Sequence, residues 1–178
     1  GKGVPAALFM VIAKTLLKNR AQLGESPEVV LEKVNNQLCE NNEADMFVTV
    51  WLGIYELSTG RLTYANAGHE CPAVMRANGK YELIQESHDF VVAGFEGMPY
   101  TLREITLYQG DKLFLYTDGV PEATNVSEEL FGEERMLDAL NTCLDKTPEQ
   151  TLHQVKEIID DFVGEADPFD DLTMLSFE

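Results

Sequence analysis

The stretch from residue 113 to residue 123, Leu-Phe-Leu-Tyr-Thr-Asp-Gly-Val-Pro-Glu-Ala, constrains this sequence more than any other. Its first four residues are apolar or aromatic and follow the turn pair Gly110-Asp111, a pattern typical of a buried strand. The strand runs directly into Asp118-Gly119. A carboxylate at the end of a buried strand is costly unless a cation or several donors face it. For this stretch alone, a solvated Asp-Gly turn is the simpler interpretation and a cation-binding aspartate is the alternative.

A second acidic segment near the C-terminus favours the cation-binding alternative. Residues 167–171 read Asp-Pro-Phe-Asp-Asp, and residues 172–177 alternate like a strand. Two strands that each meet aspartates at one end could bring those carboxylates together around a hard cation. Oxygen-only ligands of this kind suit Mg²⁺ or Mn²⁺ better than zinc. The sequence therefore predicts that Asp118 and Asp170 lie within reach of one cation.

Composition limits the classes of protein to which the chain can belong. The 178 residues fit one domain, which we place at 1–178, and nine Phe with 44% hydrophobic residues indicate an ordered core. A formal net charge of -18 argues against nucleic acid and against anionic membranes as partners. The three cysteines are widely spaced, which indicates reduced thiols and no zinc site. The apolar run at 4–13 is too short to span a bilayer, so we expect a cytoplasmic protein with no membrane insertion.

Hydrophobic periodicity predicts an α+β fold with antiparallel sheets. Strands are expected at about 46–57, 61–66, 73–77, 81–85, 102–108, 112–117 and 172–177, and helices are expected to start near residues 5, 27, 131 and 148. Strands in hairpin succession with helices in pairs argue against a parallel sheet. The strand at 102–107 pairs most simply with the strand at 112–116, and the first helix, apolar on almost every side, is expected to be buried on most faces.

Two further features are weak signals by themselves. The glycine-rich entry Gly1-Lys2-Gly3 precedes a helix and could cradle a phosphate, but no strand precedes it. His69 lies in a polar loop between strands, where it could serve as a base or a ligand. A lone loop histidine more often makes structural hydrogen bonds, and this is the interpretation we prefer.

Together, these motifs resemble the bacterial PPM-type (PP2C-like) serine/threonine phosphatases of the branch that regulates sporulation and stress-response sigma factors. Single motifs are unspecific, but six or more in the family's order are a strong resemblance, and it covers the chain end to end. The matching segments are residues 1–8, 46–49, 64–69, 110–111, 115–120, 122–123, 131–132 and 170–173.

The resemblance implies an α-β-β-α sandwich of two antiparallel sheets flanked by helices. It also implies that two Mn²⁺ or Mg²⁺ ions support hydrolysis of phosphoserine or phosphothreonine on a regulatory protein of the anti-anti-sigma type, downstream of a sensor domain. By motif position, Asp118 and Asp170 correspond to metal-ligating aspartates of the family. Asp171 follows the ligating position of its motif and is the weaker candidate of that pair.

The family's bridging aspartate stands just before the segment that matches Gly1, and the first strands precede it as well. We therefore expect a phosphatase domain that lacks its N-terminal strands and binds metal weakly as these 178 residues alone. The sheet edge and the apolar helix left uncovered should lead the chain to form a homodimer or to cover the gap with its own N-terminal segment. The alternative is a non-catalytic scaffold or protein-binding module of the same fold. A calcium-binding module is a weaker third interpretation, because residues 167–171 lack the ligand spacing of an EF-hand.

Overall fold

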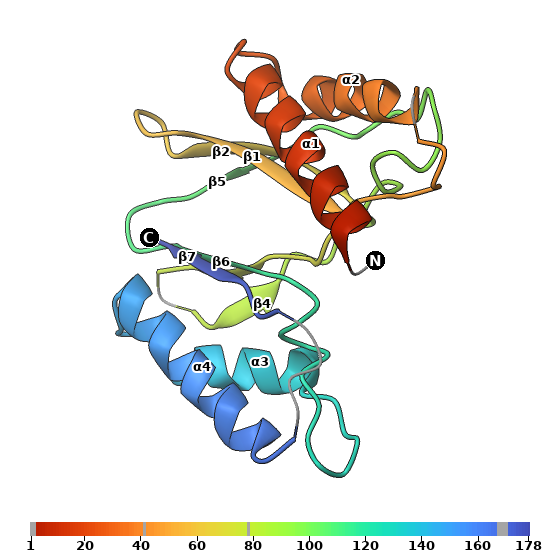
Figure 1. The fold of residues 1–178 in the computed structure, drawn as a ribbon. Coiled ribbons are helices and arrows are strands. Elements are labelled where there is room, and N and C mark those ends of the chain that lie inside the picture. Colours follow the sequence, from red (N-terminus) through yellow and green to blue (C-terminus); the bar gives the residue numbers. More distant parts are fainter. Residues whose placement is uncertain (1–2, 41, 78, 167–170) are drawn as a thin grey trace. The chain divides into compact units, whose positions relative to one another are not determined.

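The computed structural model describes residues 3–40, 42–77, 79–166 and 171–178. Its contacts divide the chain into two compact units (Figure 1). The first unit contains the chain up to His69 together with Ser87–Leu107, and the second contains Glu70–Glu86 together with Tyr108–Glu178. Each unit is thus assembled from two separate stretches of sequence, and each has a sheet and a pair of helices of its own.

The first unit contains a three-stranded antiparallel sheet in the order β1-β2-β5. The strands and helices are α1 (Val4–Ala21), α2 (Pro27–Cys39), β1 (Val50–Glu56), β2 (Arg61–Ala67) and β5 (Arg103–Thr106). The β1–β2 hairpin places Val50 opposite Ala67 and Glu56 opposite Arg61, around the turn at residues 57–60. This hairpin is the one that the Ser-Thr-Gly turn signal predicts.

The core of the first unit lies between α2 and β2 (Figure 1). Three apolar side chains on one stripe of α2, Val30, Leu31 and Val34, are fully buried, as the helical period predicts. They belong to one apolar cluster with Ala65 and Ala67 of β2. The helix begins at Pro27 after Ser26, the sequence pattern of a helix start.

The second unit contains a four-stranded antiparallel sheet in the order β4-β3-β6-β7. The strands and helices are β3 (Ala73–Met75), β4 (Tyr81–Leu83), β6 (Lys112–Tyr116), α3 (Gly132–Asn141), α4 (Pro148–Val163) and β7 (Met174–Phe177). Both helices belong to one apolar cluster with β6, centred on Phe114, Met136, Leu140 and Ile159. A capping box between Thr147 and Gln150 begins α4.

The two antiparallel sheets and the four helices described here confirm the predicted fold class. Each helix begins within one residue of the predicted start. The observed strands are shorter than the predicted ones by up to four residues at one end. The predicted pairing of the strands at 102–107 and 112–116 is wrong, because β5 pairs with β2 in one unit and β6 pairs with β3 and β7 in the other. The amide of Leu107 donates to the carbonyl of Gly60 at 2.8 Å, which continues the β2–β5 alignment. The Gln109-Gly110 pair predicts that the chain turns between β5 and β6, but it does not determine which strand each of them pairs with.

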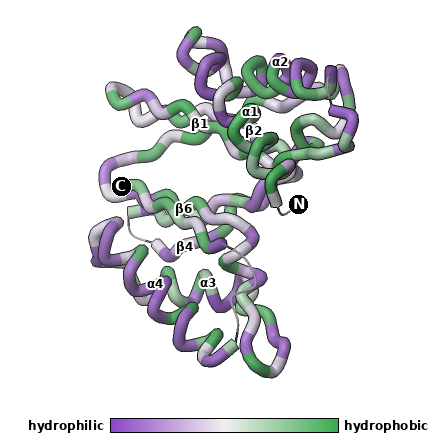
Figure 2. The backbone as a smooth tube through the Cα atoms, in the orientation of Figure 1, coloured by the Kyte–Doolittle hydropathy of each residue, from purple (hydrophilic) through white to green (hydrophobic). Residues whose placement is uncertain are grey.

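The expectation that the first helix is buried on most faces is also wrong. In α1, only Ala13 is buried among the described residues, and Phe9, Leu16 and Leu17 pack partly against α2 and its cluster. The larger of the other apolar side chains in its N-terminal half are exposed, with Val4 at 72% and Leu8 at 60%. Figure 2 shows the hydrophobic residues along this helix. An all-round apolar pattern predicts burial only where neighbouring elements cover every face. Within the described ranges, no helix combines the length and apolar character that a bilayer crossing requires.

Candidate metal centre

Asp118 lies two residues after the C-terminal end of strand β6. Phe114 is fully buried and Tyr116 is 2% exposed, and their rings stack with centroids 6.0 Å apart. Two residues after this buried pair the chain reaches the surface, where Asp118 is exposed. The apolar strand thus fixes the backbone beneath a carboxylate that solvent can reach.

The turn after β6 is closed by its own backbone. The amide of Val120 donates to the carbonyl of Thr117 at 3.0 Å, and the amide of Glu122 donates to the carbonyl of Asp118 at 2.9 Å. One carboxylate oxygen of Asp118, Oδ1, accepts from the amide of Gly119 at 2.9 Å. These bonds hold the Asp118 backbone in place and leave its second carboxylate oxygen available to a ligand.

Strand β7 brings the second acidic segment beside this turn. Tyr116 lies opposite Met174 in the antiparallel register, and the amide of Thr117 donates to the carbonyl of Thr173 at 3.1 Å. A side chain at Gly119 would collide with the carbonyl oxygen of Asp171, so the two backbones touch there. Only glycine permits so close an approach at position 119.

Of the two predicted cation ligands, Asp118 and Asp170, the structure describes Asp118 alone. Asp118 lies at the turn that contacts Asp171, and Asp171 is itself exposed. Asp167 and Asp170 lie outside the described residues, so the convergence of the Asp118 and Asp170 carboxylates stays a prediction. The described ranges contain no group of three or more histidine, cysteine, aspartate or glutamate side chains placed to hold a metal.

The surroundings of the turn favour a cation. Burial raises the pKa of Tyr116 well above its ordinary value, and the nearby carboxylates of Glu133 and Glu70 raise it further. Tyr116 therefore stays a neutral phenol at physiological pH, and acidic side chains near the strand make the local field negative. Carboxylate and carbonyl oxygens on two touching turns are the donors that Mg²⁺ and Mn²⁺ prefer, so the residues present fit a hard divalent cation.

His69 makes the bonds expected of a structural histidine. Its amide donates to Oδ1 of Asn66 at 2.8 Å, and the Asn66 amide group donates back to its carbonyl at 3.0 Å. Its ring Nδ1 lies 3.3 Å from the hydroxyl of Thr49. These contacts fix the bend that follows β2, although the preferred role for His69 stays a prediction.

The sequence pattern did not reveal two buried polar anchors. Asn35 is fully buried on α2, where its Oδ1 accepts from the amide of Ala93 and its amide group donates to the carbonyl of Phe95, each at 2.8 Å. Asp111, recognised only as part of a turn, is 4% exposed and accepts three hydrogen bonds. A polar residue on the apolar stripe of α2 was the one available signal for Asn35.

Comparison with known proteins identifies relatives of the whole chain. The family profile for Stage II sporulation protein E (SpoIIE) matches residues 1–178. The phosphoserine phosphatase RsbU of Bacillus subtilis is 34% identical over 125 residues, which cover 68% of this chain and 36% of that protein. The chain spans about a third of the length of the curated relatives that it matches.

Solved structures share the fold. The SiaA-PP2C domain of Pseudomonas aeruginosa superposes with a TM-score of 0.84 at 21% identity, covering 100% of this chain and 72% of that chain. The catalytic domain of the serine/threonine protein phosphatase PstP, solved in complex with two manganese ions, gives a TM-score of 0.64 at 16% identity over 96% of this chain and 79% of that chain. At these identities the likeness establishes the PP2C fold alone. Since the SpoIIE profile matches the chain from the first residue to the last, the chain belongs to the SpoIIE family, whose fold is that of the PP2C phosphatases.

Proposed function

We propose that this chain is the phosphatase domain of a metal-dependent protein serine/threonine phosphatase. The observation that carries the proposal is the contact between the Asp118-Gly119 turn and Asp171, which joins two acidic segments 53 residues apart in sequence, from position 118 to position 171. Membership of a family with a named phosphoserine phosphatase among its relatives supports the same reaction class.

The metal site consists, in this proposal, of Asp118 and Asp170, with Mn²⁺ or Mg²⁺ as the ion. A divalent ion bound there supplies Lewis-acid activation of water and neutralises charge on the phosphate oxygens. The residues of this chain provide the geometry: the hydrogen-bonded turn after β6 holds the Asp118 carboxylate toward solvent, where a phosphorylated side chain can approach. The PstP structure with two manganese ions supports metal use in proteins of this fold.

The substrate, in this proposal, is phosphoserine or phosphothreonine on a regulatory protein of the anti-anti-sigma type, in the cytoplasm. An upstream sensor domain controls the reaction, as expected for a domain that covers about a third of its curated relatives. The net charge of -18 supports a protein partner over nucleic acid, because a phosphate backbone would be repelled.

Homodimerisation through α1 is the proposed state of the 178-residue chain. Apolar side chains in the N-terminal half of the helix, namely Val4, Leu8, Met10, Val11 and Ile12, are 52% to 72% exposed. An apolar surface of this kind typically marks a contact with another protein. Sedimentation equilibrium should give twice the chain mass, and a Leu8→Glu variant should shift it to the monomer. A monomer at high concentration would refute this assembly without affecting the proposed reaction.

The reaction is tested with the protein at its full natural length. Phosphate release from a phosphoserine-bearing protein should require Mn²⁺ or Mg²⁺ and should fall about 100-fold or more in Asp118→Asn and in Asp170→Asn. The matched control is Glu82→Gln, which neutralises an exposed carboxylate on β4 and should keep parental turnover. Full activity of the Asp118 variant, or equal losses in the control, would refute the assignment.

A further inference from the structure

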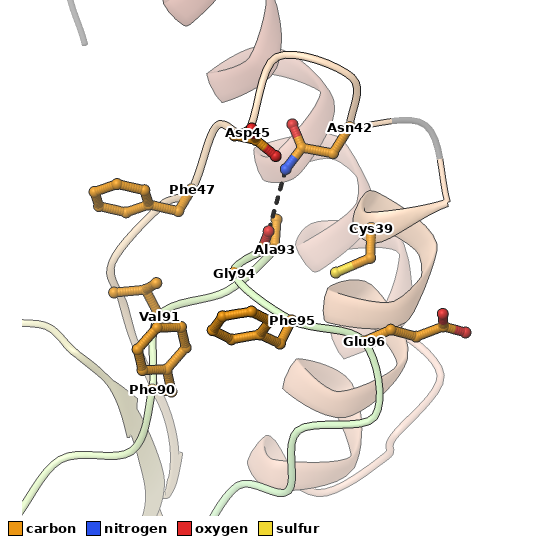
Figure 3. Close-up of a pocket in the computed structure, with 10 residues that line it drawn as sticks. All are labelled: Cys39, Asn42, Asp45, Phe47, Phe90, Val91, Ala93, Gly94, Phe95 and Glu96. Atoms are coloured by element: carbon orange, nitrogen blue, oxygen red, sulfur yellow. Dashed lines mark hydrogen bonds between the residues drawn. The ribbon is translucent and has the colours of Figure 1, made fainter.

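A pocket of about 600 Å³ lies within the first unit, and none of the residues that line it is assigned to metal binding (Figure 3). It is formed by the C-terminal end of α2 at Cys39, by the segment from Asn42 to Phe47, and by the loop at residues 90–96, called here the pocket loop. The volume falls within the range of about 300 to 1,000 Å³ that binding sites commonly have.

Three phenylalanines line the pocket and remain exposed. Phe47 is 63% exposed, Phe90 is 45% exposed and Phe95 is 64% exposed. The rings of Phe90 and Phe95 lie beside each other with centroids 5.4 Å apart (Figure 3). Exposed aromatic side chains gathered at one site, held by a fixed backbone, are the usual anchors of protein–protein contacts.

The side chains of two asparagines hold the backbone of the pocket loop by hydrogen bonds. Asn35 bonds to both Ala93 and Phe95, as described above, and the side chain of Asn42 donates to the carbonyl of Ala93 at 3.1 Å (Figure 3). Ala93 itself has a φ of 68°, which a residue other than glycine adopts only when its surroundings stabilise it. A loop that is fixed before binding loses little conformational entropy when a partner binds.

Gly94 lets the Phe90 ring lie against the loop backbone. A Cβ at position 94 would overlap the edge of that ring, so the ring would have to shift if residue 94 carried a side chain. The face of an aromatic ring is electron-rich, and a cation placed over it within about 6 Å is attracted.

The charged residues that line the pocket are acidic. Asp45 and Glu96 line the pocket, and none of its lining residues is a lysine, an arginine or a histidine. In the described part of the chain, neither carboxylate side chain makes a hydrogen bond or an ion pair. Burial and the charge of Glu96 raise the pKa of the Cys39 thiol, so the cysteine lines the pocket as a neutral group.

We propose that this pocket docks an arginine side chain, flanked by apolar residues, from a partner protein. The guanidinium stacks on the rings of Phe90 and Phe95 and pairs with Asp45 or Glu96, and the flanking apolar residues cover Phe47. A net charge of -18 on this chain makes a basic segment the electrostatically matched partner. The inference goes beyond the proposed function and does not depend on it.

A protein segment fits the site better than a free small cation. Small-molecule pockets enclose about 70–90% of their ligand, whereas the three rings here are between 45% and 64% exposed and form an open surface. A peptide that lies across the rings would cover all of them, which a small ammonium ion cannot do.

The proposal is tested on the 178-residue chain by amide NMR with defined peptides. The probe is an acetylated, amidated pentapeptide with one central arginine between two leucines and terminal glycines. Its partner peptide has citrulline, a neutral isostere, in place of arginine. The arginine peptide should shift the amide signals of residues 42–47 and 90–96 and bind about tenfold more tightly than the citrulline peptide. Affinity should fall as salt is raised, because the pairing is electrostatic.

Variants separate the contribution of the rings from that of the carboxylates. The affinity for the arginine peptide should fall about tenfold in Phe95→Ala and about tenfold in the double variant Asp45→Asn, Glu96→Gln. The matched controls, Tyr108→Ala at an exposed aromatic and Glu82→Gln at an exposed carboxylate, should leave binding unchanged. The thermal midpoint of each variant shows that the fold is retained, and the wild-type shift map does not depend on any variant.

The proposal would be overturned by equal affinity for the arginine and citrulline peptides, by tighter binding of tetramethylammonium than of the peptide, by shifts outside the pocket, or by no shifts at millimolar peptide. Concentration-dependent shifts of the pocket amides without peptide would make a second copy of this chain the occupant and would also overturn it. None of these results bears on phosphatase activity, which the Asp118→Asn assay measures separately.

Discussion

Replacing Asp111 should destabilise the second unit, because this carboxylate joins two segments of it through three hydrogen bonds. Its Oδ2 accepts from Nη1 of Arg76 at 2.8 Å and from the amide of Tyr108 at 3.0 Å, and its Oδ1 accepts from the amide of Ala77 at 2.9 Å. The side chain is 3% exposed. It therefore connects the segment after β3 to the turn that begins β6.

The size of the expected loss of stability follows from the donors that the substitution leaves without an acceptor. Asp111→Ala leaves two backbone donors without their acceptor, at about 1–3 kcal/mol each, and we expect a loss of about 3–4 kcal/mol. The Arg76 side chain is 50% exposed, so water can replace the lost hydrogen bond to its guanidinium, and this bond adds little to the loss of stability. Asp111→Asn keeps one acceptor oxygen and turns an amide group toward the other donors, so we expect the free energy of unfolding to fall by about 2 kcal/mol.

The pH dependence of the lost stability distinguishes loss of the charged hydrogen bonds of Asp111 from loss of its packing contacts. Burial by itself would raise the pKa of Asp111, but the hydrogen bonds from Tyr108, Arg76 and Ala77 outweigh it and hold the pKa below its ordinary value. A depressed folded-state pKa gives stability that is present above the unfolded-state pKa and is lost as pH falls through the folded-state pKa. The difference between wild type and Asp111→Asn should therefore stay constant from about pH 7 to pH 5 and shrink below about pH 4.

The assay is urea unfolding followed by circular dichroism at each pH, with amide exchange of Ala77 and Tyr108 as the local measurement. Asp145→Asn, at an exposed aspartate of the same unit, is the matched control and should change stability by less than about 0.5 kcal/mol. A loss under about 0.5 kcal/mol in Asp111→Ala, or a loss that does not depend on pH, would show that the Asp111 hydrogen bonds do not stabilise the fold.

Three further predictions concern single positions. Gly119→Ala should destabilise the chain by about 1–3 kcal/mol in urea unfolding, because the new Cβ meets the backbone of Asp171; an unchanged midpoint would contradict that contact. Asn35→Ala should cost about 2–4 kcal/mol and should speed amide exchange in the pocket loop, since two hydrogen bonds to that loop are lost; unchanged exchange would show that the loop does not depend on them. In phosphate-release assays of the full-length protein, His69→Ala should lose far less turnover than Asp118→Asn, and the reverse order would exchange their roles.

The elements that the sequence predicted well are those that local chemistry determines. Hairpins formed where a Ser-Thr-Gly turn joined two alternating runs, and α2 and α4 began at the predicted Ser-Pro and Thr-Pro pairs. The strand carrying Asp118 was recognisable because four consecutive apolar residues ended at an Asp-Gly pair.

What the sequence did not predict depends on partners far along the chain. Period and turn residues marked β5 and β6 as strands, but their assignment to different sheets follows from β2 and β3, about 30–50 residues earlier. The exposed face of α1 could not be predicted, because an apolar helix does not specify what covers it. The anchoring of the pocket loop by Asn35 requires a bond across about 60 residues, which no local pattern encodes.

We propose that Asp118, together with the acidic segment beside it, holds a divalent cation. Mn²⁺ is paramagnetic and broadens the amide signals of nuclei close to it, so titrating Mn²⁺ into the 178-residue chain maps the site directly. The signals of Gly119, Asp171 and Thr173 should broaden first, and Asp118→Asn should weaken the effect about tenfold or more, because Asn removes the charge that holds the ion. Broadening that begins elsewhere, for example at Asp45 and Glu96, or that persists unchanged in Asp118→Asn, would contradict the claim.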